Sequence, residues 1–321
     1  MSHEHVLLTG AAGFIGSTLC EALLADGRKV TGIDSFAANY PEAAKRDNIR
    51  GLLKSKRFTL VECDAGGVEF RDALNACHPD MIVHLAATPG VRPSIEHVLE
   101  YVDNNVRATA NVLAGAAAAG VSRIVFGSSS SVYGGGSGKP VREDDPLIPL
   151  SPYAATKVSG EALCRSFVAS CGLSITCLRF FTVYGPRQRP DMAICKLAHL
   201  IESRQPFRMN GDGESSRDYT YISDIVSGIR AALDRNVPFE AINLGSGNPI
   251  RLKTMIELTS NAIGGTPIIE RTDFPSSEPT QTFADISKAK TELGYEPRVS
   301  FEDGIAEFAA WFKATRQCES A

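Results

Sequence analysis

Short apolar runs alternate with longer amphipathic segments along the first half of the chain. A run at His5–Thr9 is followed by others at Lys29–Ile33, Phe58–Glu62, Met81–Leu85 and Arg123–Gly127, and each has the length and composition of a strand. Near-continuous apolar strands are typical of a parallel sheet that is buried on both faces. The pattern therefore predicts an α/β fold with a doubly wound parallel sheet.

The first predicted strand runs directly into a glycine-rich turn, Gly10–Gly16, with the spacing Gly-x-x-Gly-x-x-Gly. An amphipathic helix follows and ends at Gly27. A strand, glycine turn and helix in this order are typical of a Rossmann-type dinucleotide site, where the helix N-terminus offers N–H groups to a pyrophosphate. Asp34 ends the next strand, at the distance where an acid binds the adenine ribose hydroxyls. The alternative is that Asp34 only caps a turn.

The second half continues the sheet and adds a smaller unit. Further strands are predicted at Ser174–Leu178 and within Ala241–Gly247. We assign residues 1–181 and 217–250 to the dinucleotide-binding domain, and residues 182–216 and 251–321 to a smaller C-terminal α/β lobe that binds the substrate. The length of 321 residues suits one large domain with such an appended lobe.

Charge and cysteine usage narrow the possible partners. The net charge of −4 argues against nucleic acid or an anionic membrane as the main partner. The 8 cysteines form no Cys-x-x-Cys pair and no zinc-like spacing, so we expect reduced core residues and no metal. No apolar run approaches the length of a membrane span, and residues 1–4 are too few and too polar for a signal peptide. These features favour a cytoplasmic protein.

The segment Tyr153-Ala-Ala-Thr-Lys157 carries candidate chemistry. Ser151 and Pro152 predict a helix start, so Tyr153 and Lys157 lie one turn apart on the same face. We expect the ammonium of Lys157 to lower the pKa of Tyr153, which would let the tyrosine take a proton from a hydroxyl. Taken alone, the motif favours the other interpretation, a surface helix with a solvated lysine.

Together with other motifs, the segment identifies a family resemblance over essentially the whole chain. The matching pieces are Gly10–Gly16, His84–Ala87, Tyr101–Asn105, Ser128–Gly134 and Tyr153–Lys157. They resemble the extended short-chain dehydrogenase/reductases, the group of nucleotide-sugar epimerases and dehydratases. The resemblance implies NAD as cofactor, and the carboxylate of Asp34 would repel the 2′-phosphate of NADP.

The resemblance also implies roles for individual residues. It places Ser129, four residues before Tyr133, in a catalytic triad with Tyr153 and Lys157, whereas Ser128 reads as a loop serine. The implied cofactor-binding residues are Gly10, Ala12, Gly13, Phe14, Ile15, Gly16, Asp34, Asp64, Ala65, Leu85, Ala86, Ala87, Asn104, Tyr153, Lys157 and Phe181.

Departures from the common family pattern bear on the substrate. Dehydratases of the family place Asp-Glu where this chain has Ser130 and Ser131, and decarboxylases usually carry a Glu there, so loss of water or carbon dioxide is disfavoured. Thr182 replaces a common Asn, and the Thr version resembles the branch that epimerises UDP-glucuronate at C4. The three hydroxyls could donate to the C6 carboxylate of a uronate, with Arg92 or Arg189 adding charge. The alternative for each arginine, slightly less favoured, is a solvated or salt-bridged loop residue.

The diphosphate of a UDP-sugar requires a cation. Arg217, which precedes Asp-Tyr-Thr-Tyr, is implied for that role by the resemblance. A second family arginine is missing from its usual place, which corresponds to residues 275–278, and Arg271 is the candidate substitute.

These residues predict an NAD-dependent 4-epimerase of a UDP-sugar, with UDP-glucuronate as the best candidate. The alternatives are a neutral-sugar 4-epimerase acting on UDP-glucose or UDP-N-acetylglucosamine, a simple sugar dehydrogenase, and an NAD-binding protein without catalysis. The resemblance also implies a homodimer that packs through helices at about Val98–Ala119 and Pro152–Cys171.

Overall fold

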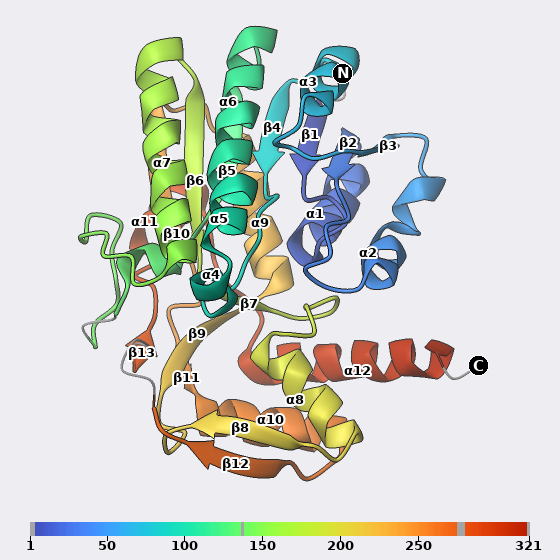
Figure 1. The fold of residues 1–321 in the computed structure, drawn as a ribbon, viewed down its shortest axis with the longest axis vertical. Coiled ribbons are helices and arrows are strands. Elements are labelled where there is room, and N and C mark those ends of the chain that lie inside the picture. Colours follow the sequence, from blue (N-terminus) through green and yellow to red (C-terminus); the bar gives the residue numbers. More distant parts are fainter. Residues whose placement is uncertain (1–3, 136–137, 275–279, 320–321) are drawn as a thin grey trace.

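The computed structural model describes residues 4–135, 138–274 and 280–319. Its larger part contains a seven-stranded sheet in the order β10-β6-β5-β4-β1-β2-β3, in which every neighbouring pair is parallel. Figure 1 shows these strands side by side in the upper half of the molecule. The bounds are β1 (His5–Thr9), β2 (Lys29–Asp34), β3 (Phe58–Glu62), β4 (Met81–His84), β5 (Arg123–Ser129), β6 (Ser174–Phe180) and β10 (Phe239–Leu244).

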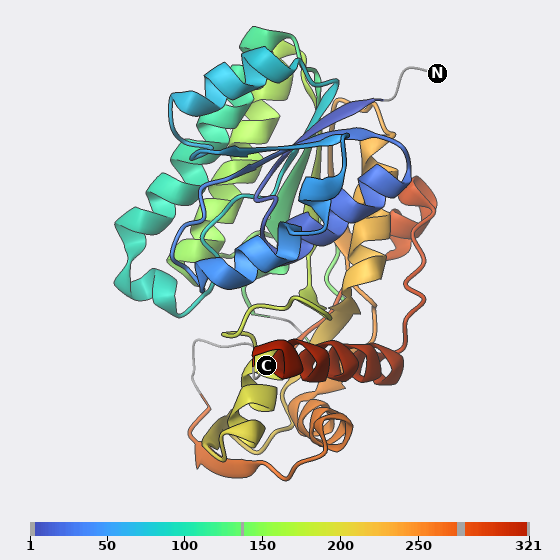
Figure 2. The ribbon, with the colours of Figure 1, turned by 90° about the vertical axis from the view of Figure 1, so that its right-hand side faces the viewer.

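Helices cover both faces of this sheet, which explains its apolar strands. On one face, α1 (Phe14–Ala25) packs against α9 (Ile222–Leu233), and on the other α6 (Ala108–Ala119) packs between α3 (Glu69–Cys77) and α7 (Pro152–Cys171). Figure 2 shows the two layers on either side of the strands. Successive β1 residues enter opposite cores, Val6 with the α1 side and Leu7 with the α6 side. The doubly wound parallel sheet is thereby confirmed.

The smaller domain lies below the sheet in Figure 1. It contains a four-stranded sheet of β7 (Thr182–Tyr184), β9 (Ser216–Tyr221), β11 (Pro249–Arg251) and β13 (Gln281–Thr282), and a parallel pair of β8 (Pro206–Asn210) and β12 (Ile268–Thr272). Its helices are α8 (Ala193–Glu202), α10 (Leu252–Ile263) and α12 (Phe301–Glu319).

The strand pairing divides the chain between the two domains at positions that differ from the predicted boundaries at 217 and 250. Most of β9 and of β11 falls within the range 217–250, yet both belong to the small sheet, because β9 pairs with β7 and with β11. Conversely, α11 (Ser287–Leu293) falls within 251–321 but packs on β10 and α9 of the large domain. Hydrogen bonding between strands distant in sequence sets these boundaries.

Local signals placed the ends of several elements well. The Ser151 hydroxyl accepts a 3.1 Å hydrogen bond from the amide of Ala154, and Pro152 is the first residue of α7. Helix α6 ends at Gly120, which has left-handed backbone angles. Two strands are longer than predicted, since β5 continues to Ser129 and β6 to Phe180. Within the described ranges, no helix has the length and apolarity needed to cross a membrane.

Further short elements complete the large domain and carry several residues of the site. They are α2 (Glu42–Ile49), α4 (Pro93–Glu96), α5 (Val98–Tyr101) and a π-helical segment at Val102–Arg107, which leads into α6.

Candidate active site

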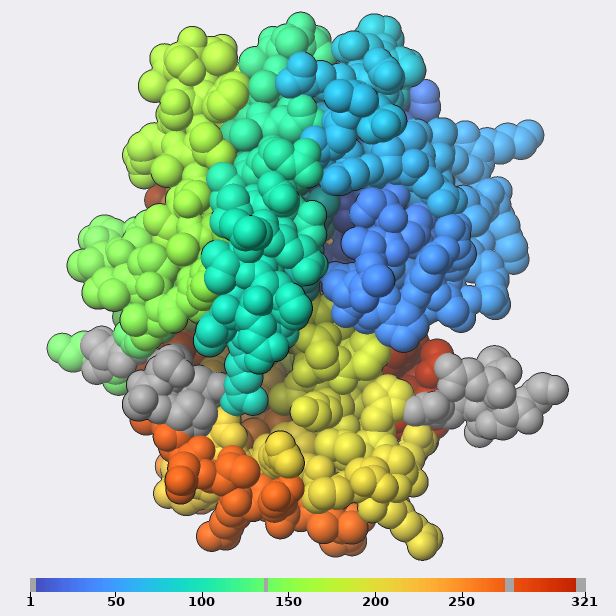
Figure 3. All heavy atoms as spheres, viewed as in Figure 1, coloured from blue at the N-terminus to red at the C-terminus, as the bar shows by residue number. Residues whose placement is uncertain are grey.

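A cavity of about 470 Å³ opens where the glycine turn meets the carboxyl ends of the sheet strands. Figure 3 shows the surface hollowed between the blue N-terminal segment and the green-blue segment around α6. Ligands of open α/β sheets bind at such strand ends. The turn residues Gly10, Gly13, Phe14, Ile15 and Gly16 line this cavity.

Glycine is required at two positions of the turn. Gly10 has a φ of +78°, and a Cβ on it would lie 2.9 Å from the amide nitrogen of Ala86. A Cβ on Gly16 would lie 2.0 Å from the carbonyl oxygen of Gly10. The turn is therefore packed against the start of α1, which brings the N-terminus of the helix to the cavity wall.

Asp34 lines the same cavity and has a fixed orientation. One carboxylate oxygen accepts a 2.9 Å hydrogen bond from the amide of Ala12, and the other accepts one of 2.9 Å from the amide of Phe36. Asp34 thus caps a turn and also lines the cavity, and its contact with the adenine ribose stays a prediction. Ala12 itself is not among the residues that line the cavity; it contributes by holding Asp34.

Most of the other residues implied for the cofactor come together here. Asp64, Leu85, Ala86, Ala87, Asn104 and Phe181 line the cavity, whereas Ala65 is buried and does not. The Asn104 side chain donates a 2.9 Å hydrogen bond to the Thr88 hydroxyl.

The sequence analysis missed several lining residues, including Tyr40, Lys45, Thr88 and Met192. The Lys45 ammonium is engaged, since it donates to the Ala37 carbonyl at 2.5 Å and to the Asn39 side chain at 2.6 Å. No hydrogen-bond partner among the described residues reaches the buried hydroxyl of Tyr40. Nothing in the local sequence marks these residues, because segments after β2, after β4 and before α8 bring them to the cavity only in the folded chain.

The expected triad residues Ser129, Tyr153 and Lys157 all line the cavity. Lys157 is buried, donates a 2.7 Å hydrogen bond to the carbonyl of Gly127, and has its nitrogen 6.0 Å from the centroid of the Tyr153 ring. The ring of Tyr101 packs edge-on against Tyr153, with 6.3 Å between the centroids. The end of β5 and the first turns of α7 thus meet at one point of the cavity wall.

The electrostatics of this group differ from the expectation. Burial raises the pKa of Tyr153, while a hydrogen bond with Ser129 and the positive charge of Arg189 oppose the rise. Burial lowers the pKa of Lys157 to about 8. The charge that acts on Tyr153 in this arrangement is that of Arg189, not that of Lys157 as the sequence analysis expected. Because both Tyr153 and Lys157 are buried, desolvation shifts their pKa values more than their one-turn spacing along the helix does.

A second cavity of about 510 Å³ lies between the two domains. Ser130, Ser131 and Thr182 line both cavities, so the two meet beside Tyr153. No hydrogen bond to another described residue engages the hydroxyls of Ser130 and Thr182. The Ser131 hydroxyl lies 3.1 Å from that of Ser129, which donates to it.

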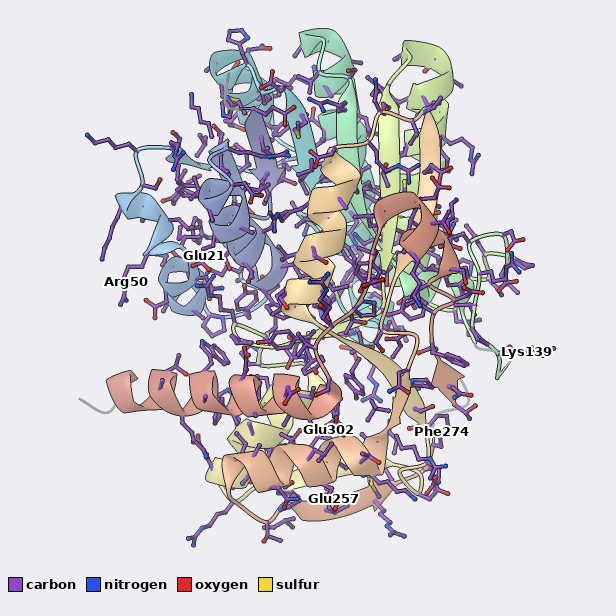
Figure 4. The ribbon with its side chains drawn as sticks, turned by 180° about the vertical axis from the view of Figure 1, so that it is seen from behind. Glu21, Arg50, Lys139, Glu257, Phe274 and Glu302 are labelled. Atoms are coloured by element: carbon purple, nitrogen blue, oxygen red, sulfur yellow. The ribbon has the colours of Figure 1, made fainter. Side chains whose placement is uncertain are left out.

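Cations surround this second cavity. Arg92, Lys196, Arg208 and Arg217 line it. Phe274 also lines it, and Figure 4 shows this residue beside the strands of the small domain, on the side away from the C-terminal end of α12. A long cleft with basic walls next to a dinucleotide cavity suits an anionic, extended ligand.

Two of the arginines expected at the substrate are placed differently. Arg189 lines the first cavity and pairs with Asp191 through two 2.9 Å hydrogen bonds, so its salt-bridged alternative also applies. Arg271 is exposed on β12 and lines a separate shallow depression with Asp212, not the cleft between the domains. The stretch 275–278, where the family arginine is missing, lies outside the described residues.

The fold and this site define a class: a Rossmann-type fold in which Ser129, Tyr153 and Lys157 line a cavity that meets a second cleft with basic walls. Comparison with known proteins agrees, since a profile described as "NAD dependent epimerase/dehydratase family" matches residues 6–245. That range is most of the chain, and the chain belongs to this NAD-dependent family.

Individual relatives match along nearly the entire chain. A Bacillus subtilis (strain 168) protein named uncharacterized UDP-glucose epimerase YtcB is 42% identical, over 98% of this chain and 99% of its own. The UDP-glucuronate 4-epimerase of Thermodesulfobacterium geofontis (strain OPF15) is 39% identical, over 96% of both. The crystal structure of UDP-glucuronic acid 4-epimerase from Bacillus cereus with UDP-glucuronic acid and NAD is 40% identical, covers 97% of this chain and 99% of that one, and has a TM-score of 0.92.

Proposed function

We propose that this protein interconverts UDP-glucuronate and UDP-galacturonate by epimerisation at C4, with NAD as its cofactor. The observation that carries the proposal is the position of three hydroxyl residues, Ser130, Ser131 and Thr182, which line both cavities next to Tyr153. Relatives named as UDP-glucuronate 4-epimerases, at 39% and 40% identity, support it.

The first cavity fits NAD. The open N-terminus of α1 faces the place where a pyrophosphate would lie, and Asp34 would accept from the adenine ribose hydroxyls. The unpartnered hydroxyl of Tyr40 is a further polar atom that a bound ligand would satisfy. When bound, NAD would supply a hydride acceptor, and the positive charge of its nicotinamide ring would favour the phenolate of Tyr153.

The residues of the triad then have distinct tasks. Tyr153 removes the proton from the C4 hydroxyl as C4 is oxidised, and it returns the proton when the 4-keto sugar is reduced on its other face. Ser129 donates a hydrogen bond to the reacting oxygen and holds its developing charge. Lys157, fixed to the Gly127 carbonyl, holds its ammonium 6.0 Å from the centroid of the Tyr153 ring, on the cavity wall where the cofactor would bind.

The hydroxyl cluster has to restrain a reactive intermediate. Oxidation of a uronate at C4 places a ketone β to the C6 carboxylate, and such an acid loses carbon dioxide readily when its carboxylate turns out of the plane of the carbonyl. Hydroxyl donors from Ser130, Ser131 and Thr182 would hold the carboxylate in one orientation. Arg189, in the wall of the first cavity, would add charge from the cofactor side.

The neutral-sugar epimerase is the second candidate, and the relative named as a UDP-glucose epimerase at 42% identity favours it. Hydroxyl donors also suit the C6 hydroxyl of a neutral hexose. In either case Arg217 would contact the diphosphate, with Arg92 near it in the cleft wall.

We also propose a homodimer. The segment from α4 into the π-helical turn exposes a row of large apolar side chains: Ile95 is 61% exposed, Leu99 is 80% exposed, and Val98 and Val102 are each 41% exposed. This row is continuous with α6 and α7, the helices implied for the dimer by the family resemblance. Exposed apolar rows of this kind mark association surfaces.

The proposed reaction is tested by incubating the purified protein with UDP-glucuronate, UDP-glucose and UDP-N-acetylglucosamine and following the products by ¹H NMR. We expect UDP-galacturonate from the first substrate with no net build-up of NADH. Faster turnover of UDP-glucose would replace the uronate proposal with the neutral-sugar one, and stoichiometric NADH would indicate a dehydrogenase.

A further inference from the structure

A buried ion pair lies directly beneath the triad and has no part in the chemistry described above. Glu161 on α7 and Arg179 on β6 are 5% and 4% exposed. The guanidinium holds both carboxylate oxygens, with 2.9 Å from Nε to Oε1 and 2.7 Å from Nη2 to Oε2. Two ions this deep in the protein need a reason for being there, because an apolar pair of similar volume is often at least as stable.

The remaining hydrogen-bonding capacity of the pair is used by neighbouring elements. The Ser128 hydroxyl donates to Glu161 Oε1 at 2.6 Å. On its other side, Arg179 donates to the Tyr133 hydroxyl at 2.7 Å, and Tyr133 donates to the side chain of Asn243 at 2.7 Å. Ser128 is therefore a fully engaged buried residue and not the loop serine that the sequence analysis took it for.

These contacts connect the two elements that carry the triad. Ser128 sits between Gly127, whose carbonyl accepts from Lys157, and Ser129. Glu161 follows Lys157 by one turn on α7. The Glu161 carboxylate belongs to α7 and accepts a hydrogen bond from Ser128 at the end of β5. It therefore links the strand that carries Ser129 to the helix that carries Tyr153.

We propose that Glu161, held by Arg179, is a positioning residue that locks the end of β5 onto α7 through Ser128 and places its carboxylate one helical turn from Lys157. The proposal rests on the epimerase function above for its kinetic test, and a second measurement below is independent of that function.

The charges around Lys157 agree with this role. Burial lowers the pKa of Lys157 to about 8, and the carboxylate of Glu161 opposes that shift. The His84 side chain facing it from β4 is neutral at pH 7, because burial and the charge of Lys157 lower its pKa to about 3. The other described groups that face Lys157 are Tyr153, Cys164 and the ring of Phe126.

The main test is the pH profile of kcat/KM for Glu161→Gln. Activity that needs a charged Lys157 is lost as the pH rises through the pKa of that lysine. Removing the carboxylate lowers this pKa, so we expect the alkaline limb to move down by about one pH unit. A purely structural role would lower kcat/KM equally at every pH.

Ser128→Ala separates positioning from charge. It removes the link to the strand end and keeps the carboxylate, so we expect kcat to fall by about 3- to 10-fold with KM and the alkaline limb unchanged. Ser159→Ala is the matched control, since this hydroxyl on the same helix donates to the Ala155 carbonyl one turn earlier, and we expect wild-type kinetics.

A readout without substrate distinguishes failure of this proposal from failure of the proposed function. In protein labelled at lysine ¹³Cε, the Lys157 resonance is assigned by its loss in Lys157→Arg and titrated by NMR. We expect it to titrate at lower pH in Glu161→Gln than in the wild type. A folded Glu161→Gln protein with an unchanged Lys157 titration and pH profile overturns the proposal. If Glu161→Gln does not fold, wild-type kcat in Ser128→Ala overturns it, and a reduced kcat with unchanged KM supports it.

Discussion

Replacing Thr182 by Ala tests the uronate pocket most directly. Thr182 is the first residue of β7, and its backbone is held by the register of β7 with β9, in which it pairs with Tyr219. Its hydroxyl makes no hydrogen bond to another described residue, so the truncation leaves no buried partner unsatisfied. We therefore expect the free energy of unfolding to change by no more than about 0.5 kcal/mol.

The effect on catalysis should be much larger. A hydrogen bond from a hydroxyl to a charged acceptor contributes about 1.5–3 kcal/mol, and loss of such a donor would lower kcat/KM on UDP-glucuronate by roughly 10- to 100-fold. The less restrained 4-keto acid should also lose carbon dioxide, so a UDP-pentose should appear beside UDP-galacturonate. Activity on UDP-glucose, if the wild type has any, should change little because no carboxylate is present.

The assay follows UDP-glucuronate, UDP-galacturonate and UDP-pentose together by ¹H NMR. Thr182→Ser keeps the hydroxyl and should retain most of the activity, whereas Thr182→Val keeps the volume and should behave like Thr182→Ala. Wild-type kcat/KM in Thr182→Ala, or equal losses on UDP-glucuronate and UDP-glucose, would refute a carboxylate contact at this residue.

Three further outcomes are expected. Tyr153→Phe should lower kcat by at least ~10²-fold, the scale of general-base removal, with NAD affinity and melting temperature unchanged; retention of more than a small fraction of kcat would exclude Tyr153 as the base. NAD should bind clearly more tightly than NADP in a competition measurement, because the carboxylate of Asp34 is fixed by two backbone amides and faces the cavity; equal affinities would contradict this. Light scattering at micromolar concentration should give a dimer, and Leu99→Glu should give a monomer, since it places a charge in the exposed apolar row; a monomeric wild type would contradict the dimer.

Much of the architecture was predictable from local patterns. Apolar runs located the strands of the large sheet, and the glycine turn and the Ser151–Pro152 pair located the starts of α1 and α7. These signals are read within a few residues of the feature they predict. The family resemblance carried by short motifs implied the group of Ser129, Tyr153 and Lys157, and these residues and Asp34 do line one cavity.

Other features could not be predicted because they depend on contacts between distant segments. Strand pairing and packing do not follow the division at 217 and 250, since β9 and β11 pair within the small sheet and α11 packs on the large domain. Arg271 could be proposed for the diphosphate from its sequence position alone, but β12 carries it to an exposed site outside the cleft. The run of serines predicts a polar loop at Ser128, whereas its hydroxyl donates a hydrogen bond to Glu161, 33 residues later in the chain.

The side-chain chemistry at Tyr153 shows the same difference between what local sequence predicts and what distant contacts determine. The primary structure is sufficient to put Tyr153 and Lys157 one turn apart on a helix, because helix geometry depends on local spacing. It is not sufficient to set their pKa values, which depend on burial and on charges that arrive from elsewhere. Burial raises the pKa of Tyr153, and Arg189, which lies 36 residues away in a loop, opposes this rise. Glu161 opposes the lowering of the Lys157 pKa, and it does so from a hydrogen-bond network that spans β5, β6 and α7. Solvent exclusion and long-range charge are properties of the packed chain, so the folded arrangement alone determines how this site holds its protons.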